Sequence, residues 1–334
     1  MSAPLLDVRS LAVELPVRRE LRPVLADVSI AVDAGEMVGL VGESGSGKSM
    51  TARAIAGLLP PGARVSGEIG FDGRSLTELD RDAVRRLRVS DIAMVFQDPR
   101  AHINPVRRIG DYLCESLRIN LHVGRRDATE LACDLLQRVG LPDPTRRLSQ
   151  YPYELSGGML QRVMIAAALA VKPRLLLADE PTTALDVTVQ AEILAILDQM
   201  RREDGLGMLF ITHDLELAAA VCDRICVMYA GRIVEEQPAA RLYARPRHPY
   251  TQALMQSRPQ LEGPAHDLHA IPGVPISAYE APPGCPFRPR CPYAQEVCER
   301  WEPHIEPGPT RVACVRVDEL DPAASASIPG LTGG

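Results

Sequence analysis

Long apolar runs are missing from this chain of 334 residues. The longest, Val163 to Val171, is less than half of the roughly 20 residues that a membrane-spanning helix needs, and Lys172 and Pro173 follow it at once. Near the N-terminus, Asp7 and Arg9 stand where a signal peptide would carry its apolar core. We therefore expect a cytoplasmic protein that reaches any membrane through partner proteins.

Lysine and aromatic residues are also scarce. Lysine occurs only at positions 48 and 172, aromatic residues make up 4% of the chain, and the first of them is Phe71. The formal net charge of −6 leaves no basic surface for nucleic acid, so we expect no nucleic-acid partner. The length and the 46% hydrophobic content are enough for one large α/β domain with an appendage.

Short apolar segments predict strands at residues 5–15, 24–32, 37–41, 65–72 and 92–96, and a helix at residues 48–59. Between residues 99 and 155 the pattern changes to helices, among them 109–119 and 128–139. From residue 175 onward, strands at 175–178 and 208–212 alternate with helices at 187–201 and 215–221. This alternation predicts an α/β fold with a mostly parallel sheet and an inserted helical subdomain.

A glycine-rich segment joins the strand at residues 37–41 to the following helix and fits the pattern G-x-x-x-x-G-K-S/T. Its glycines let successive backbone N–H groups surround phosphate oxygens, and the helix adds the positive end of its dipole. We expect Lys48 to reach the β- and γ-phosphates of ATP and the Ser49 hydroxyl to ligate Mg²⁺. The alternative is a glycine-rich turn that binds no phosphate. The nucleotide-binding residues assigned here are Gly42, Glu43, Ser44, Gly45, Ser46, Gly47, Lys48, Ser49 and Met50.

A second apolar strand, Leu175 to Ala178, ends in Asp179 and Glu180. If this strand runs beside the phosphate loop, Asp179 lies near the Mg²⁺ shell and Glu180 can polarise a water for attack on the γ-phosphate. Helix N-termini often begin with such carboxylates, so the weight of this motif comes from its pairing with the phosphate loop.

A third motif reads Leu155-Ser156-Gly157-Gly158-Met159 and precedes a long apolar stretch. The pattern is typical of a helix whose N-terminus carries no bulky side chains, which is a second anion site. The alternative is a plain loop with a serine N-cap.

Together these motifs resemble the ABC ATPase family. Six motifs occur in the family's order along this chain. They are the phosphate loop, Gln97, Leu155–Met159, Leu175–Glu180, Ala184-Leu185-Asp186 and His213. They match its Walker A loop, Q-loop, signature, Walker B strand, D-loop and switch histidine.

The resemblance implies that two cassettes dimerise head to tail, with ATP between the phosphate loop of one and the signature helix of the other. Ser156, Gly157, Gly158 and Asp186 then contribute to nucleotide binding. It implies that Glu180 and His213 are catalytic, and that Ser49, Gln97 and Asp179 hold Mg²⁺. Hydrolysis loosens the dimer, because ATP binds the closed state more tightly.

Two features depart from the family. The signature ends in Met159 where the family more often has Gln, and no aromatic residue precedes the phosphate loop to stack on adenine. We expect apolar or arginine side chains between Val17 and Val24 to hold the base.

A narrower resemblance, over roughly Leu5 to Val315, is to the dipeptide/oligopeptide importer branch, and nickel importers share much of it. It rests on Phe96-Gln97-Asp98-Pro99, on residues 178–190 and 228–235, on His248-Pro249-Tyr250 and on Ile271-Pro272-Gly273. It implies an ATPase at the cytoplasmic face of the membrane, bound to two permease subunits and served by an extracytoplasmic substrate-binding protein. A second, related ATPase subunit is favoured over a homodimer. The alternatives are a metal-chelate importer and, more remotely, a non-transport ABC ATPase.

Four cysteines crowd into a proline-rich segment near the C-terminus that has little apolar sequence of its own. Their spacing is C-x5-C-x6-C-x15-C, and a metal site could supply the folding energy that such a segment lacks. Zinc sites favour C-x2-C pairs, which are absent here, and the resemblance points to a [4Fe–4S] cluster, with Zn²⁺ or unligated thiols as alternatives. The ligands implied are Cys285, Cys291, Cys298 and Cys314.

The predicted division is an ATP-binding core at residues 1–98 and 160–245, a helical subdomain at 99–159 that carries the signature, a C-terminal extension at 246–322 and a flexible tail at 323–334. A phosphate-loop kinase or GTPase needs neither the signature nor His213. A non-hydrolysing homologue is disfavoured by Glu180 and His213.

Overall fold

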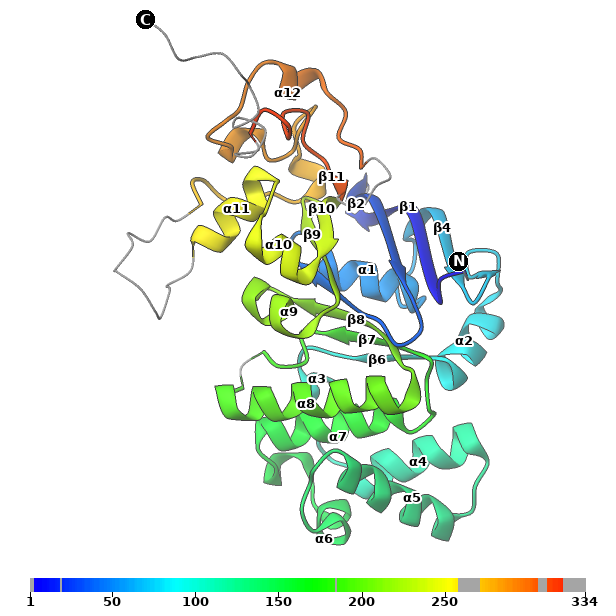
Figure 1. Ribbon diagram of the computed structural model, residues 1–334. Helices are drawn as coiled ribbons and strands as arrows, with labels where there is room; N and C mark the ends of the chain where they lie inside the picture. The colour runs from blue at the N-terminus through cyan, green and yellow to red at the C-terminus, as the bar shows by residue number, and fades with distance from the viewer. Residues whose placement is uncertain (1–2, 19, 184, 258–270, 306–310, 321–334) are drawn as a thin grey trace, which may run out of the picture.

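The computed structural model describes residues 3–18, 20–183, 185–257, 271–305 and 311–320. Their strands form one path in the order β5-β4-β1-β2-β10-β9-β3-β8-β7-β6, with β11 beside β10 (Figure 1). Layers of helices flank the inner strands, which confirms the predicted α/β class. The predicted tail at residues 323–334 lies outside the described residues.

The N-terminal part of the sheet is antiparallel. It contains β1 (Leu6–Val17), β2 (Glu20–Val32), β4 (Arg64–Phe71) and β5 (Arg74–Ser75). β1 pairs with both β2 and β4, and its inward residues alternate with exposed ones, as expected for a sheet that buries one face. β2 begins four residues earlier than the apolar pattern predicted, because its first residues pair with the end of β1 across a tight turn.

The inner strands run parallel. They are β3 (Met37–Val41), β6 (Ile92–Val95), β7 (Leu175–Asp179), β8 (Gly207–Thr212) and β9 (Arg224–Tyr229). Every residue of β3, β7 and β8 is buried, which is why these strands read as continuous apolar runs rather than as alternation. β10 (Arg232–Pro238) returns antiparallel to β9, and neither of these two was predicted as a strand.

Five helices lie outside both the inserted group and the C-terminal segment. They are α1 (Lys48–Ile55), α2 (Arg81–Ser90), α8 (Val187–Asp204), α9 (Leu215–Val221) and α10 (Ala239–Ala244). α1 ends four residues short of the predicted Leu59, because Gly57 takes a left-handed conformation (φ +64°) that stops the helix.

The helices between β6 and β7 include the segment predicted as an insertion, residues 99–159, but the last of them, α7, continues beyond that range to Leu169. They are α3 (Pro99–His102), α4 (Ile109–Leu121), α5 (Arg125–Arg138), α6 (Pro144–Ser149), the 3₁₀ turn η1 (Pro152–Glu154) and α7 (Gly157–Leu169). Figure 1 shows α4 to α7 at the opposite end of the molecule from the C-terminal segment. Among the described residues, no helix has the length and apolar content to cross a membrane.

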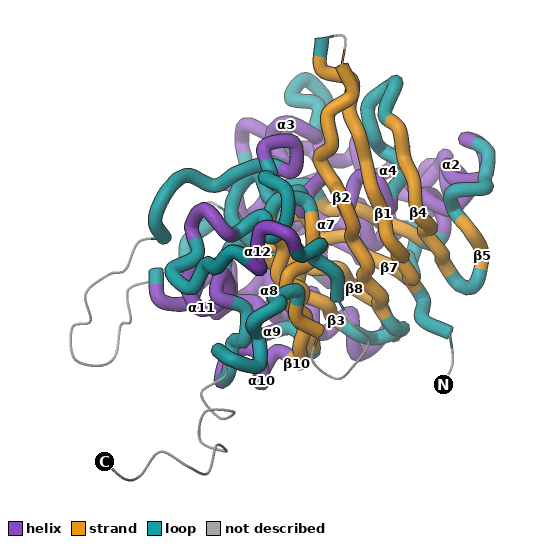
Figure 2. The backbone as a smooth tube through the Cα atoms, turned by 90° about the horizontal axis from the view of Figure 1, so that it is seen from above, coloured by secondary structure: helices purple, strands orange, loops and turns teal. Residues whose placement is uncertain are grey.

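The C-terminal segment is mostly loop, as Figure 2 shows in teal. It contains α11 (Pro249–Gln256), η2 (Ala278–Glu280), η3 (Arg288–Arg290), α12 (Val297–Arg300) and β11 (Arg311–Val312). Phe287 and Tyr250 are buried and join the main apolar core, so this segment packs on the ATP-binding part of the chain.

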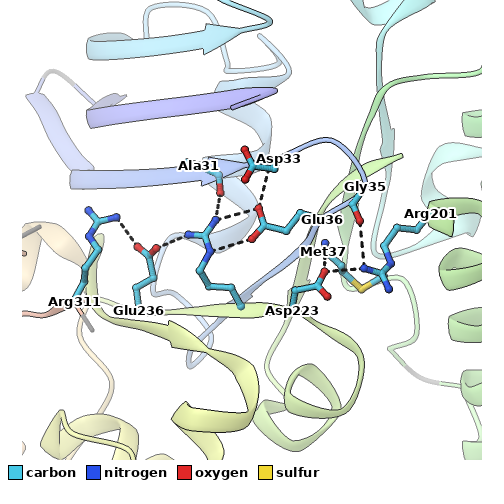
Figure 3. Close-up of polar contacts among 10 residues, drawn as sticks. Ala31, Asp33, Gly35, Glu36, Met37, Arg201, Asp223, Glu236 and Arg311 are labelled. Carbon is cyan, nitrogen blue, oxygen red and sulfur yellow. Dashed lines mark hydrogen bonds and ion pairs between the residues drawn. The ribbon is translucent and has the colours of Figure 1, made fainter. Parts of the chain in front are cut away.

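Ion pairs also attach the C-terminal segment to the sheet (Figure 3). The Glu236 carboxylate, on β10, accepts from Arg311 Nη1 at 2.7 Å and from Arg224 on β9. Arg224 also donates to Glu36 Oε1 and Oε2 at 3.1 and 3.2 Å, just before β3. A continuous series of ion pairs therefore links β11, β10, β9 and β3.

Candidate nucleotide-binding site

The glycine-rich loop lies between the end of β3 and the start of α1, as predicted. Gly45 and Gly47 have φ values of +83° and +111°, which favour glycine. A Cβ on Gly42 would lie 2.2 Å from the Met228 carbonyl oxygen, and one on Gly47 would lie 2.7 Å from a methyl carbon of Leu25. The loop is therefore held against β9 and β2 at a distance that only glycine allows.

The Lys48 side chain lies within this loop and is 5% exposed. Its Nζ donates to the carbonyl oxygens of Gly42 at 2.8 Å and of Glu43 at 3.0 Å. Burial lowers the pKa of Lys48, while the carboxylates of Glu180, Asp179 and Glu43 oppose that shift.

Ser49 and Asp179 meet where α1 begins and β7 ends. The Ser49 hydroxyl donates to Asp179 Oδ1 at 2.8 Å. Burial raises the pKa of Asp179, and the Ser49 hydrogen bond lowers it. A hydroxyl and a carboxylate in contact fit the oxygen-rich donor set that Mg²⁺ prefers.

The Glu180 carboxylate is the point where three distant parts of the sequence converge. Its Oε2 accepts from Gln97 Nε2 at 2.8 Å and from the Thr183 hydroxyl at 2.8 Å, and His213 Nδ1 lies 3.5 Å away. Glu180 itself has a left-handed backbone (φ +47°), and its N–H donates to the Ile211 carbonyl on β8. The structure thus brings together the three predicted residues, and it adds Thr183, which the sequence analysis missed although it lies only three residues after Glu180.

The third motif forms the N-terminus of α7. Ser156 is the N-cap residue, and its hydroxyl accepts from the Met159 N–H at 3.3 Å. A Cβ on Gly158 would lie 2.5 Å from a methyl carbon of Val189 on α8, whose N-terminus is capped by Asp186. The signature residues and Asp186 therefore lie at the N-termini of α7 and α8, which are in contact. Ala184, of the same predicted D-loop, lies outside the described residues.

Comparison with known proteins identifies this arrangement. Residues 25–183 match the ABC transporter family, and residues 234–298 match the C-terminal region of oligopeptide/dipeptide transporters. The probable peptide ABC transporter ATP-binding protein of Sinorhizobium fredii is 47% identical over 322 residues, which cover 95% of this chain and 96% of that protein. The oligopeptide transport ATP-binding protein OppD of Escherichia coli is 42% identical over 318 residues, covering 95% of this chain and 94% of that protein.

The chain belongs to the ABC transporter family. Among solved structures, the dimeric cassette MJ0796 in a post-hydrolysis state with ADP and Pi is 29% identical, with a TM-score of 0.64 over 70% of this chain and 98% of that chain. The predicted ABC fold, the ATPase activity and the use of ATP are confirmed at this level, and the family implies permease partners in the membrane.

The structure of this ABC ATPase also shows an arginine–tyrosine pair beside the phosphate loop. The guanidinium of Arg22, on β2, lies 5.1 Å from the centre of the Tyr279 ring, on η2. η2 adjoins Gly231, where a Cβ would lie 2.8 Å from Ala278 Cβ, and the Gly231 N–H donates to the Ser46 carbonyl of the phosphate loop. Arg22 lies within the range Val17–Val24, and Tyr279 is far away from it along the chain.

A groove lies between α4, α7 and β6 of the ABC ATPase. Its lining includes Phe96 and His102, which flank Gln97 and stack with ring centres 4.1 Å apart and an interplanar angle of 5°. Tyr112 on α4 and Met164 on α7 also line it. The groove therefore joins the Gln97 segment to the inserted helices.

The four C-terminal cysteines of the ABC ATPase line one cavity together with Phe287 and Trp301. Burial, with smaller contributions from the neighbouring thiols, raises the pKa of Cys285 to about 11. Within the described residues, however, no three His, Cys, Asp or Glu side chains are close enough to hold a metal ion. The comparisons and the structure therefore support neither the predicted [4Fe–4S] cluster nor Zn²⁺.

Proposed function

We propose that this chain is the ATP-hydrolysing subunit of an importer of oligopeptides or dipeptides. The observation that carries the proposal is the match of residues 234–298 to the C-terminal region of oligopeptide/dipeptide transporters, outside the ATPase core. Relatives that span nearly the whole chain carry names of peptide importers, which agrees with this cargo. Import of nickel is the alternative, and the transport experiment below distinguishes it from import of peptides.

The catalytic assignment follows from the groups around Glu180. We propose that its carboxylate orients the attacking water, since Gln97 and Thr183 donate to one of its oxygens and so fix its direction. His213 lies on the same carboxylate and is proposed to contact the γ-phosphate. Ser49, Asp179 and Gln97 are the residues that would hold Mg²⁺, which would stabilise the negative charge of the phosphates.

The signature is proposed to bind the ATP of a second subunit. Ser156 caps α7, so the first backbone N–H groups of a helix of 13 residues are available to an anion. Gly157 and Gly158 carry no side chain that would block the approach of a phosphate, and Asp186 caps the adjacent helix. A related partner ATPase is the proposed second subunit, in preference to a second copy.

We propose that the nucleobase lies against Arg22 and Tyr279. Gln97, Glu180 and His213, which are proposed to act near the γ-phosphate, follow β6, β7 and β8, and these strands lie on one side of β3 in the sheet. The nucleoside end of ATP then lies toward the other side, where β2 carries Arg22 and η2 carries Tyr279. An aromatic ring and a planar guanidinium are suitable surfaces for stacking a base.

Permease docking is proposed at the groove between α4, α7 and β6. Its apolar and aromatic lining would take a short helix of a membrane subunit, and its contact with the Gln97 segment would link that helix to the nucleotide. The chain would therefore act at the cytoplasmic face of the membrane. An extracytoplasmic substrate-binding protein would join through the permeases, and the charge of −6 favours no nucleic-acid partner.

We propose that the four C-terminal cysteines hold a [4Fe–4S] cluster. Four thiols around one buried cavity fit the donor set of such a cluster, and a cluster holds its cysteines farther apart than a single ion does. Zn²⁺ and unligated thiols are the alternatives, and the metal content of the protein distinguishes them. The cluster would supply folding energy to the segment. Anaerobic purification with a visible spectrum and iron and sulfide assays tests it; colourless protein without iron would refute it.

The importer proposal is tested by reconstitution in liposomes with the permease subunits and the partner ATPase. We expect ATP-dependent uptake of labelled short peptides, and its loss in Glu180→Gln. ATP-dependent uptake of nickel without peptide uptake would refute the peptide assignment. Leaving out the partner ATPase distinguishes a heterodimer, which loses transport, from a homodimer, which keeps it.

A further inference from the structure

The phosphate loop of this chain carries an acidic residue, Glu43, whose carboxylate is held by an arginine from the C-terminal segment. Arg290 Nη1 donates to Glu43 Oε2 at 2.7 Å, and Nη2 donates to Oε1 at 3.1 Å. This is a two-bond fork, the geometry in which a guanidinium fixes a carboxylate most firmly. The Arg290 side chain is 4% exposed and the Glu43 side chain is 20% exposed, so the arginine is buried and the carboxylate is partly shielded from water.

Further contacts fix both partners of this pair. Arg290 Nε donates to the Pro272 carbonyl at 2.8 Å, and Nη1 lies 3.4 Å from the Tyr229 hydroxyl. The backbone N–H of Glu43 donates to the Tyr250 hydroxyl at 2.9 Å, and Tyr250 is fully buried. The C-terminal segment therefore holds Glu43 by its side chain and by its backbone.

A carboxylate in a phosphate-binding loop opposes binding of the polyanion, because its negative charge repels the phosphates. A buried arginine that forms two hydrogen bonds with that carboxylate cancels the charge and fixes the direction of the side chain. Attachment of the C-terminal segment to the core does not by itself need a carboxylate of the phosphate loop, since Arg311 already pairs with Glu236 on β10.

We propose that Arg290 is a positioning residue of the ATP site, which neutralises Glu43 and holds the phosphate loop in its binding conformation. The C-terminal segment is then part of the ATP-binding apparatus. This inference rests on the proposed placement of the phosphates at Gly42–Ser49. Lys48→Ala tests that placement separately, since unchanged ATP binding in that variant would remove the phosphates from the loop whatever Arg290 does.

The experiment measures equilibrium binding of ATP, ADP and AMP by titration calorimetry with the full chain, in a Glu180→Gln background that prevents hydrolysis. Arg290→Gln is expected to weaken ATP binding roughly tenfold, because it leaves one uncompensated negative charge beside the polyphosphate. The loss of affinity is expected to be largest for ATP, smaller for ADP and smallest for AMP. It is also expected to be smaller at high salt concentration. The double variant Glu43→Gln/Arg290→Gln is expected to return to within about threefold of the background affinity.

A matched control is Arg300→Gln on α12, whose pair with Glu296 is exposed and distant from the loop in sequence; it is expected to bind ATP normally. If the double variant binds no better than Arg290→Gln, or if all three nucleotides lose affinity equally, Arg290 is only a staple and the proposal is wrong. If Arg290→Gln does not fold, the variant Arg290→Lys, which keeps the positive charge, tests the neutralisation of Glu43 instead. Its affinity for ATP should stay within about threefold, and a tenfold loss would overturn the neutralisation.

Discussion

The ion-pair chain of Figure 3 allows a quantitative test of what holds the C-terminal segment and the sheet together. Its central residue is Arg224, which donates to Glu36, to Glu236 and to the Ala31 carbonyl at 2.7 Å. The substitution Arg224→Met removes all of these bonds while it keeps much of the side-chain volume. It leaves the carboxylates of Glu36 and Glu236, whose side chains are 17% and 7% exposed, with fewer partners.

The expected cost follows from what remains bound. Removing one partner of a buried ion pair costs about 3–5 kcal/mol, mostly because a buried charge is left uncompensated. Here Glu236 keeps Arg311, and Glu36 still accepts from the Asp33 N–H at 2.8 Å. We therefore expect Arg224→Met to lower the free energy of unfolding by about 3 kcal/mol, the lower end of this range.

The assay is equilibrium unfolding in guanidinium chloride, followed by far-UV circular dichroism and by the fluorescence of Trp301, the only tryptophan of the chain. Arg224→Met/Glu36→Met should recover a large part of the loss, because the unpaired carboxylate is gone. Arg202→Met is the matched control: Arg202 pairs with Asp198 at 2.8 Å, but its side chain is 72% exposed, and no measurable change is expected. Equal midpoints for Arg224→Met and Arg202→Met would refute the reasoning.

Three further predictions concern the ATP site. Glu180→Gln should keep ATP binding and lower the hydrolysis rate by about 10²–10⁴, measured by phosphate release, and a normal rate would exclude Glu180 as the base. Gly158→Ala should abolish most ATPase activity of the assembled transporter, because its Cβ would lie 2.5 Å from a methyl carbon of Val189, whereas Gly124→Ala, at φ −66° with no close contact, should keep it. Tyr279→Ala should weaken ATP binding roughly tenfold while Tyr279→Phe binds normally; if both variants bind normally, the base does not stack there.

Much of the site could be predicted from the sequence because it depends on local patterns. The strand–glycine loop–helix order around Lys48 and the apolar strand that ends in Asp179 and Glu180 each occupy one short segment, and the structure has them as expected. Strand β10 was harder to predict, since its polar residues Glu235 and Glu236 are buried by tertiary partners.

The sequence by itself determined the family, the phosphate loop and the ends of the strands that carry the predicted catalytic carboxylates. Only the tertiary structure decided that Glu180 is held by Gln97, that Tyr279 lies over Arg22, and that Arg290 holds the phosphate loop through Glu43. The physical reason is distance along the chain: Arg290 and Glu43 are 247 residues apart, and no local pattern records which distant charge a folded chain brings to a given carboxylate.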